Sequence, residues 1–163
     1  MPDLGTVPLV RLSQRPYICV RDEKTQNTDG GTFTSGAWQT RVLNTIQTDT
    51  YNLIRLAANQ ILLPAGTYQC SIRCPAFQVS FHVARLQDLS RGVTLLLGGN
   101  GYTNSAAGYA VTDSWIVGQF TLYAEARVEV QHQAQVTKAT DGFGIKHNLT
   151  TEVYTVAQFW KDA

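Results

Sequence analysis

The hydrophobic pattern of this chain repeats every two residues, and that period constrains its fold more than any other feature. Between Thr67 and Cys74, apolar or thiol side chains alternate with polar ones. Successive side chains of a strand point to opposite faces, so this stretch predicts a strand with one dry face. The same period recurs later in the chain. The faces expected to be buried are Tyr68, Cys70, Ile72 and Cys74; Phe77, Val79, Phe81 and Val83; and Ala126, Val128, Val130, His132 and Ala134.

Turn-forming residues separate the alternating stretches. Pro64-Ala65-Gly66 precedes one strand, Cys74-Pro75-Ala76 is expected to end it, and Gly-rich loops are expected at 98–108 and 141–144. The expected strands are 16–22, 37–43, 50–57, 67–74, 77–87, 92–98, 112–123, 126–137 and 151–161. Many short strands separated by turn-forming residues predict an all-β antiparallel sandwich or barrel.

The last expected strand carries large side chains on both faces. Val153, Thr155, Ala157 and Phe159 alternate with Tyr154, Val156, Gln158 and Trp160. In a strand with one face in solvent, every second side chain is polar, but in this strand both sets of alternating side chains include large apolar groups. We therefore expect this strand to be covered on both sides.

Composition excludes several classes of protein. The 163 residues suit a single domain, and 13 basic against 12 acidic side chains give a net charge of +1, which argues against a nucleic-acid partner. No apolar run approaches the ~20 residues that cross a bilayer, and Met1-Pro2-Asp3-Leu4 lacks signal-peptide features. Only 15% of residues are charged, so neutral polar groups must form much of the surface.

No cofactor, metal ion or catalytic activity is expected. The three cysteines are an odd, low number and fit small buried side chains better than disulfides or zinc ligands. His82 and His132 fall on separate strands that could meet, but no ligand cluster surrounds them in sequence. Nucleophile-elbow and phosphate-loop motifs are absent from the sequence, and Glu125 and Glu129 would lie ~13 Å apart along a strand.

Several stretches resemble a group of tailed-bacteriophage virion proteins, over about residues 16–161. They are Arg21-Asp22-Glu23-Lys24, the segment Gly30 to Arg41, Leu43-Asn44-Thr45, Leu63-Pro64-Ala65-Gly66-Thr67-Tyr68, Ala139 to Gly144 and Phe159-Trp160-Lys161. Proteins of this group are usually described as tail or tail-fibre proteins. They are similar to the tumour-necrosis-factor-like jelly roll, which typically forms homotrimers.

The resemblance implies an architecture and an interface. Residues 16–163 would form one antiparallel jelly-roll domain of a homotrimer, with Gly66-Thr67-Tyr68 opening a central strand and the last strand packing at the trimer centre. The implied interface residues are Tyr68, Tyr154, Val156, Gln158 and Trp160. Residues 1–15 would form an extended arm that binds another capsid or tail protein.

The function implied is that of a structural protein in a phage virion, assembled in the host cytoplasm. With no shaft before the first strand, a capsid decoration or cement protein competes with a tail-associated fibre head. The alternative is a module that binds a host receptor or surface glycan during adsorption. Its contact residues would come from two loops and are Gly99, Asn100, Tyr102, Asn104, Asp141 and Phe143.

Overall fold

The computed structural model describes residues 14–162. Residues 1–13 and Ala163 lie outside it, so the arm expected at 1–15 falls almost wholly outside the described chain and stays a prediction. Within the described residues there is no helix long and apolar enough to span a membrane.

The described residues form twelve strands and no helix. The strands are β1 (Tyr17–Lys24), β2 (Gln39–Thr40), β3 (Thr45–Asp49), β4 (Arg55–Ala57), β5 (Gln60–Leu63), β6 (Gly66–Phe77), β7 (Ser80–Asp88), β8 (Val93–Leu97), β9 (Gly101–Thr103), β10 (Val111–Leu122), β11 (Ala126–Ala134) and β12 (Glu152–Lys161).

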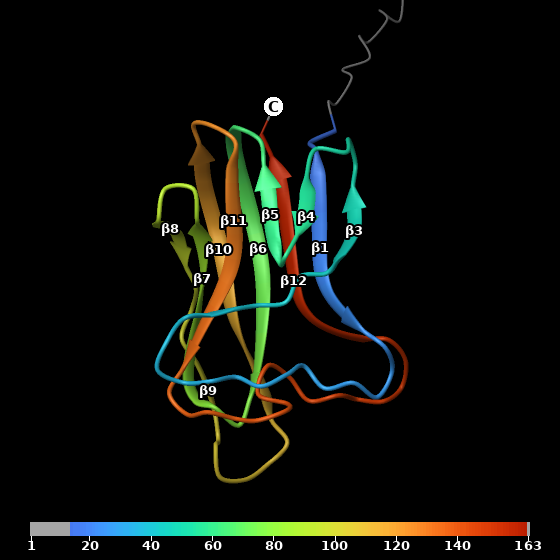
Figure 1. Cartoon of the computed structure of the whole chain (residues 1–163), viewed down its shortest axis with the longest axis vertical. Coiled ribbons are helices and arrows are strands. Elements are labelled where there is room, and N and C mark those ends of the chain that lie inside the picture. The colour runs from blue at the N-terminus through green and yellow to red at the C-terminus, as the bar shows by residue number, and fades with distance from the viewer. Residues whose placement is uncertain (1–13, 163) are drawn as a thin grey trace, which may run out of the picture.

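Two sheets make a sandwich (Figure 1). One has the order β10-β6-β12-β1-β3; the other has β4-β5-β11-β7-β8, with β2 added to β11 and β9 to β7. Every pairing between these strands is antiparallel, which confirms the expected fold class. The first and last strands are neighbours, with Tyr17 opposite Trp160, so residues at the two ends of the chain share the centre of one sheet.

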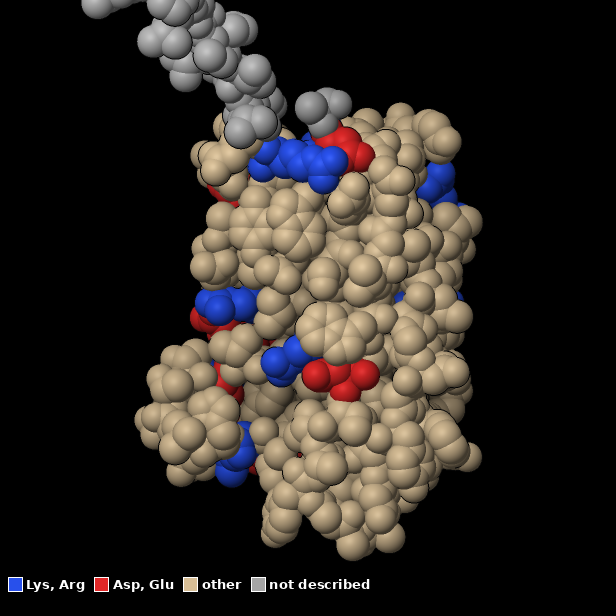
Figure 2. All heavy atoms as spheres, turned by 180° about the vertical axis from the view of Figure 1, so that it is seen from behind, with Lys and Arg blue, Asp and Glu red and all other residues tan. Residues whose placement is uncertain are grey.

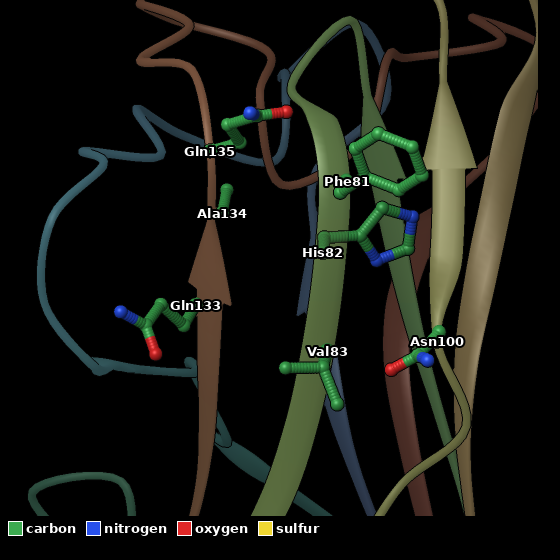
Figure 3. Close-up of a pocket in the computed structure, with 7 residues that line it drawn as sticks. All are labelled: Phe81, His82, Val83, Asn100, Gln133, Ala134 and Gln135. Carbon is green, nitrogen blue, oxygen red and sulfur yellow. The ribbon is translucent and has the colours of Figure 1, made fainter.

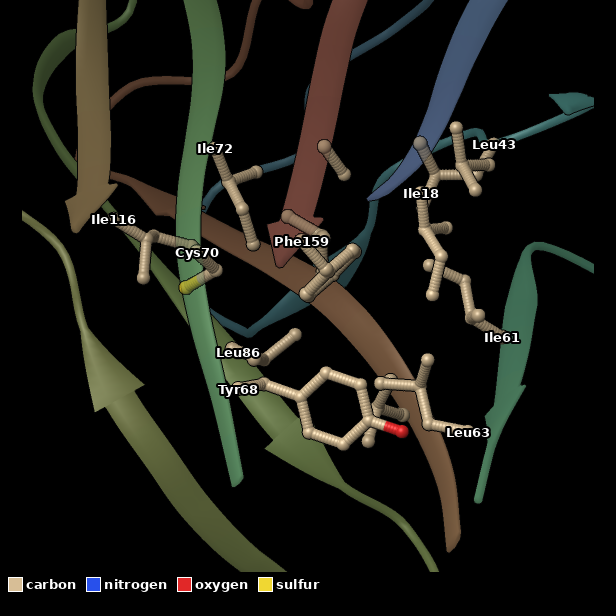
Figure 4. Close-up of a cluster of buried hydrophobic side chains, with 14 of the residues drawn as sticks. Ile18, Leu43, Ile61, Leu63, Tyr68, Cys70, Ile72, Leu86, Ile116 and Phe159 are labelled. Atoms are coloured by element: carbon tan, nitrogen blue, oxygen red, sulfur yellow. The ribbon is translucent and has the colours of Figure 1, made fainter. Parts of the chain in front are cut away.

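The main core fills the space between the sheets, as the side chains in Figure 4 show. The expected alternation of β6 is confirmed, because Tyr68, Cys70, Ile72 and Cys74 are all buried. The inward set of β11 is confirmed as well. All three cysteines are buried and free, as expected.

A second, smaller core lies apart from the first. It consists of Phe33, Ala76, Val79, Ala134 and Phe143. Phe33 and Phe143 stack with ring centroids 4.4 Å apart. The segments before β2 and after β11, which cross the lower part of Figure 1, contribute the two rings and are joined by backbone hydrogen bonds.

The expected break after Cys74 is wrong, because β6 continues through Pro75 to Phe77. The backbone N and O of a strand residue point to the same side, and the Pro75 carbonyl accepts a hydrogen bond from Arg41 rather than from β10. The missing Pro75 N–H is therefore on the side away from β10. On that side β12 pairs with β6 only as far as Arg73, so the proline interrupts no ladder.

The stripe expected from Phe77 to Val83 is also wrong. Phe77 and Val79 are buried, whereas Phe81 is 60% exposed. Between them the chain passes from one sheet to the other, and Gln78 and Ser80 adopt positive φ angles of 52° and 64°. This corner shifts the alternation by one residue.

Three expected boundaries differ. The strand expected at 50–57 is replaced by β3 and β4 with a turn between them, and the one expected at 37–43 shrinks to β2. The loop expected at 98–108 contains β9, which pairs with β7. Strand β5 lies next to the Pro-Ala-Gly turn and was not expected.

Candidate functional site

The side chains of the five-stranded sheet that point away from the core form a broad surface, called here the outer face. Strand registers place these side chains in rows that cross the sheet. The rows are Trp115, Arg73, Val156 and Arg21; Val117, Ser71, Gln158 and Cys19; and Gln119, Gln69, Trp160 and Tyr17.

The outer face exposes large apolar groups. Trp115 is 47% exposed and Val117 is 67% exposed, although both lie in the middle of a twelve-residue strand. Figure 2, which views the molecule from this side, shows a mostly uncharged surface with separate groups of blue and red atoms at its upper end, along one side and near its middle. Exposed apolar surface of this extent is typical of protein interfaces.

One corner of the outer face is already ordered within the chain. The rings of Tyr17 and Trp160 lie 5.4 Å apart, and Gln158 Nε2 donates a hydrogen bond of 2.7 Å to the Tyr17 hydroxyl. Burial raises the pKa of Tyr17, so the hydroxyl is neutral. These side chains form a rigid, uncharged surface.

The charged groups of the outer face lack complete hydrogen bonding. Arg73 Nε and Asp113 Oδ1 are 3.4 Å apart, and neither atom has a hydrogen-bond partner within the described chain. Arg21 forms an ion pair with Glu23, but its Nε has no partner there either. These nitrogen and oxygen atoms are themselves buried, and each arginine lies beside a carboxylate of its own chain, so Arg73 and Arg21 bring no unpaired charge to the outer face.

The expected interface residues divide into two groups. Val156, Gln158 and Trp160 lie half-buried on the outer face of the described chain. Tyr68 instead lies in the main core, stacked on Phe120 with centroids 5.4 Å apart.

Tyr154 is covered by segments of its own chain. Its hydroxyl donates to the Thr28 carbonyl at 2.6 Å, and its ring packs against the backbone of Gly144, where a Cβ would come within 2.4 Å of the ring. Only 4% of Tyr154 is exposed. A partner chain can therefore reach very little of Tyr154.

The first expected contact loop is largely exposed. Gly99, Asn100, Tyr102 and Asn104 all reach the surface. Tyr102 lies in β9 rather than in a loop and is 53% exposed beside Phe81. These four residues lie on the opposite sheet from the outer face or just beyond it.

The second expected contact loop contributes mainly to structure. Phe143 belongs to the second core, with 8% exposure, and Asp141 lies 3.5 Å from Lys138 Nζ. Arg41 covers the Phe143 ring at 4.3 Å from its centroid. Phe143 thus offers almost no surface for a receptor.

A shallow cavity of about 420 Å³ opens on the seven-stranded sheet (Figure 3). Its lining residues are Phe81, His82, Val83, Asn100, Gln133, Ala134 and Gln135. The cavity borders the first expected contact loop. The sequence did not indicate it, because Phe81 and Val83 were expected to point into the core.

His82 and His132 do come together. His82 Nδ1 is 3.0 Å from His132 Nε2, and His82 Nε2 is 2.8 Å from Thr112 Oγ1. Burial lowers the pKa of His82 to about 4 and the pKa of His132 well below its usual range, so both rings are neutral at pH 7. In the described part of the chain no group of three or more potential metal ligands forms. The two rings link β7 to β11 and, through Thr112, to β10.

Trp115 and Val117 belong to the outer face but were not among the expected interface residues. They alternate with the buried Ser114 and Ile116. The signal was present: β10, like β12, carries large apolar side chains on both faces. Trp115 and Val117 point away from the core, and no segment of the described chain covers them.

Comparisons with known proteins identify the class of fold. No family model and no curated protein sequence matches the chain. Solved structures do match. The globular domain of zebrafish complement 1qA protein is similar at a TM-score of 0.59, 12% identity, 91% coverage of this chain and 98% of that chain.

Two further structures agree. Murine APRIL at pH 5.0 gives a TM-score of 0.60 at 11% identity, covering 91% of this chain and all of that chain (100%). Eiger TNF from S. frugiperda gives 0.57 at 14% identity, covering 91% and 94%. The chain therefore has the jelly-roll fold shared by TNF-like and C1q-like domains. At these identities the likeness establishes the fold alone.

Proposed function

We propose that this protein is a non-enzymatic structural module that works as a homotrimer. The observation that carries the proposal is the outer face, which exposes the large apolar side chains Trp115 and Val117 and pairs its two arginines with carboxylates of the same chain. The trimeric state is the one implied by the jelly-roll resemblance. Three copies would cover Trp115, Val117 and Trp160, together with the rest of the outer face.

The outer face has the area that a stable interface needs. The five strands contain twelve, twelve, ten, eight and five residues. At ~3.4 Å per residue and ~4.8 Å between strands, they cover ~770 Å². A standard interface buries ~800 Å² of each partner, so the outer face matches the area of one such interface.

The reactive side chains support a role without catalysis. Burial raises the pKa of Cys70 and Cys74 to about 12, so neither thiol supplies a nucleophilic thiolate at neutral pH. His82 and His132 are buried and hydrogen-bonded to each other. His82 also lines the cavity of Figure 3, but its low pKa and its hydrogen bonds to His132 and Thr112 fit a neutral structural ring.

The interface is tested by placing a charge in it. Val117→Arg puts three cations into the proposed trimer interface and should yield monomers, since burying an unpaired charge costs several kcal/mol. The control is Val93→Arg, because Val93 is also exposed (43%) but lies on the other sheet. Sedimentation velocity should show the control sedimenting like the wild type. A trimeric Val117→Arg protein would refute the interface.

We further propose that the trimer is a structural part of a bacteriophage virion, either a capsid decoration or a tail-associated fibre head. The resemblance over about residues 16–161 supports this setting, and an arm at 1–15 would be its anchor. Mass spectrometry and immunogold microscopy of purified particles test the proposal. Deleting residues 1–15 should abolish incorporation and leave the trimer intact; normal incorporation would refute the anchor.

A second candidate function is adsorption to a host surface. The observation that favours it is the cavity beside Asn100 and Tyr102, with two exposed aromatic rings. A cell-adsorption assay with the purified protein tests it, since saturable binding to host cells is expected.

A further inference from the structure

Six side chains at one end of the seven-stranded sheet form a surface, called here the Phe81 patch. The pairing of β7 with β9 and with β11 sets them in two rows. The rows are Gln135, Phe81 and Tyr102, and Gln133, Val83 and Asn100. Four of these residues line the cavity in Figure 3 together with Asn100, and Tyr102 stands beside it.

The two aromatic rings of the patch are exposed, and no other segment of the described chain covers them. Phe81 is 60% exposed and Tyr102 is 53% exposed, and their centroids lie 4.9 Å apart at 54°. Pairing of β9 with β7 holds the two rings in place, and Gly101 allows it, since a Cβ there would lie 2.2 Å from the His82 ring. The rings form a fixed apolar platform.

Neutral amides surround this platform. The side chains of Asn100 and Gln133 make no hydrogen bond to the described residues, and Gln135 uses only Oε1, which accepts from Ser80 Oγ at 2.9 Å. Each amide offers both donors and an acceptor. The patch therefore presents unused hydrogen-bonding groups of both kinds around two rings.

The patch carries no net charge. Among the residues that line the cavity only His82 is titratable, and its ring is neutral at pH 7 because burial lowers its pKa to about 4. The next cation along β7, Arg85, is already engaged: Nε donates to Gln131 Oε1 at 2.7 Å, and the guanidinium lies 4.1 Å from the Trp38 ring centroid. Nothing here favours an acidic or a basic ligand.

We propose that the Phe81 patch is a binding site for a neutral saccharide. A pyranose ring offers an apolar C–H face that fits an aromatic ring, and hydroxyls at its edge that both donate to and accept from amides. The cavity volume of about 420 Å³ lies within the ~300–1,000 Å³ of small-ligand sites. A protein partner would find too few apolar groups here, since the patch has two rings and one valine.

The site is independent of the proposed trimer interface. It is built from one chain and lies on the seven-stranded sheet, whereas the outer face belongs to the five-stranded sheet. A trimer would carry three copies, which multiplies weak binding to a repetitive surface glycan. Loss of saccharide binding and loss of the trimer are therefore separate outcomes.

A glycan array tests the proposal directly. The array carries neutral glucans, galactans and mannans beside sialylated and sulfated oligosaccharides. We expect the wild type to bind neutral glycans only, and titration calorimetry with the best neutral oligosaccharide then gives the affinity. Absence of neutral glycan binding, or preference for acidic glycans, overturns the proposal.

Variants locate the site. Phe81→Ala and Tyr102→Ala should each weaken binding at least about tenfold, equivalent to ~1.4 kcal/mol. Gln133→Glu keeps the size of the side chain but replaces the neutral amide by a carboxylate, and should weaken binding too. The control is Tyr123→Ala, since Tyr123 is 85% exposed and directly follows the last residue of β10.

Melting temperature and molecular mass are measured for every variant, so that a misfolded protein is not mistaken for a binding defect. Saccharide binding that survives Phe81→Ala and Gln133→Glu in folded protein overturns the assignment. The assignment is also overturned if the wild type binds no glycan and instead binds a protein through the Phe81 patch.

Discussion

Arg41 joins the two sheets, and its removal is the substitution expected to be most costly to the fold. Its backbone N–H donates to the Val130 carbonyl in the seven-stranded sheet. Its fully buried side chain donates to the Thr155 hydroxyl at 2.7 Å, the Pro75 carbonyl at 3.0 Å and the Phe143 carbonyl at 3.1 Å. Thr155 and Pro75 belong to the five-stranded sheet. Burial lowers the pKa of Arg41 to about 10, so it is still a cation at pH 7.

The expected loss follows from these three contacts. Arg41→Met fills most of the volume but leaves three buried acceptors without donors, at ~1–3 kcal/mol each. Relief from burying the guanidinium offsets part of this cost. We therefore expect the free energy of unfolding to fall by ~3–5 kcal/mol. Arg41→Lys should lose less, because one ammonium can reach some of the acceptors.

Urea unfolding measures this effect. With a slope of ~2 kcal/mol per M, the midpoint of Arg41→Met should move down by about 2 M. All proteins are compared at one concentration, because dissociation of a trimer would shift the midpoint. The control is Arg55→Met, since Arg55 is exposed and makes no ion pair within the described chain. A loss of less than ~0.5 kcal/mol for Arg41→Met would contradict the inter-sheet role of this side chain.

Three further substitutions or conditions test other parts of the structure. Gly101→Ala should lower the melting temperature by several degrees, because its Cβ would meet the His82 ring at 2.2 Å, whereas Gly99→Ala, with only one atom at 3.9 Å, should not. The pKa of His82 is lowered to about 4, so the folded protein resists protonation, and the free energy of unfolding should fall by ~2 kcal/mol from pH 7.5 to pH 5.0 in urea melts; a flat profile contradicts this. Lys24→Met leaves the buried Asp22 carboxylate without its partner at 2.5 Å and should destabilise strongly, while adding Asp22→Asn should restore much of the loss.

The alternation of hydrophobic residues predicted the strands best where each strand stays in one sheet. In β6 and β11, local periodicity alone assigned the buried face correctly. The stripe through Phe81 failed because the chain changes sheets at Gln78 and Ser80, whose positive φ angles shift the parity by one. Neither residue type requires such angles, so the shift depends on tertiary structure.

The candidate sites depended on contacts that no local pattern shows. Arg41 reads as an ordinary surface residue, and its side-chain partners lie 34, 102 and 114 residues further along the chain. Tyr154 is covered by Thr28, which lies 126 residues earlier in the chain, and by Gly144 in the loop that precedes β12. Trp160 could be placed on an outward face from its parity, because β12 runs without a bulge from Val156 onward.

The central claim is that the outer face, with Trp115 and Val117 on its edge strand β10 and Trp160 on its central strand β12, is covered by two further copies of this chain. Light scattering coupled to size-exclusion chromatography measures the mass of the purified protein in solution without any substitution. The account predicts about 54 kDa, three times the 18.0 kDa of one chain. A stable species of 18.0 kDa at micromolar concentration would contradict it.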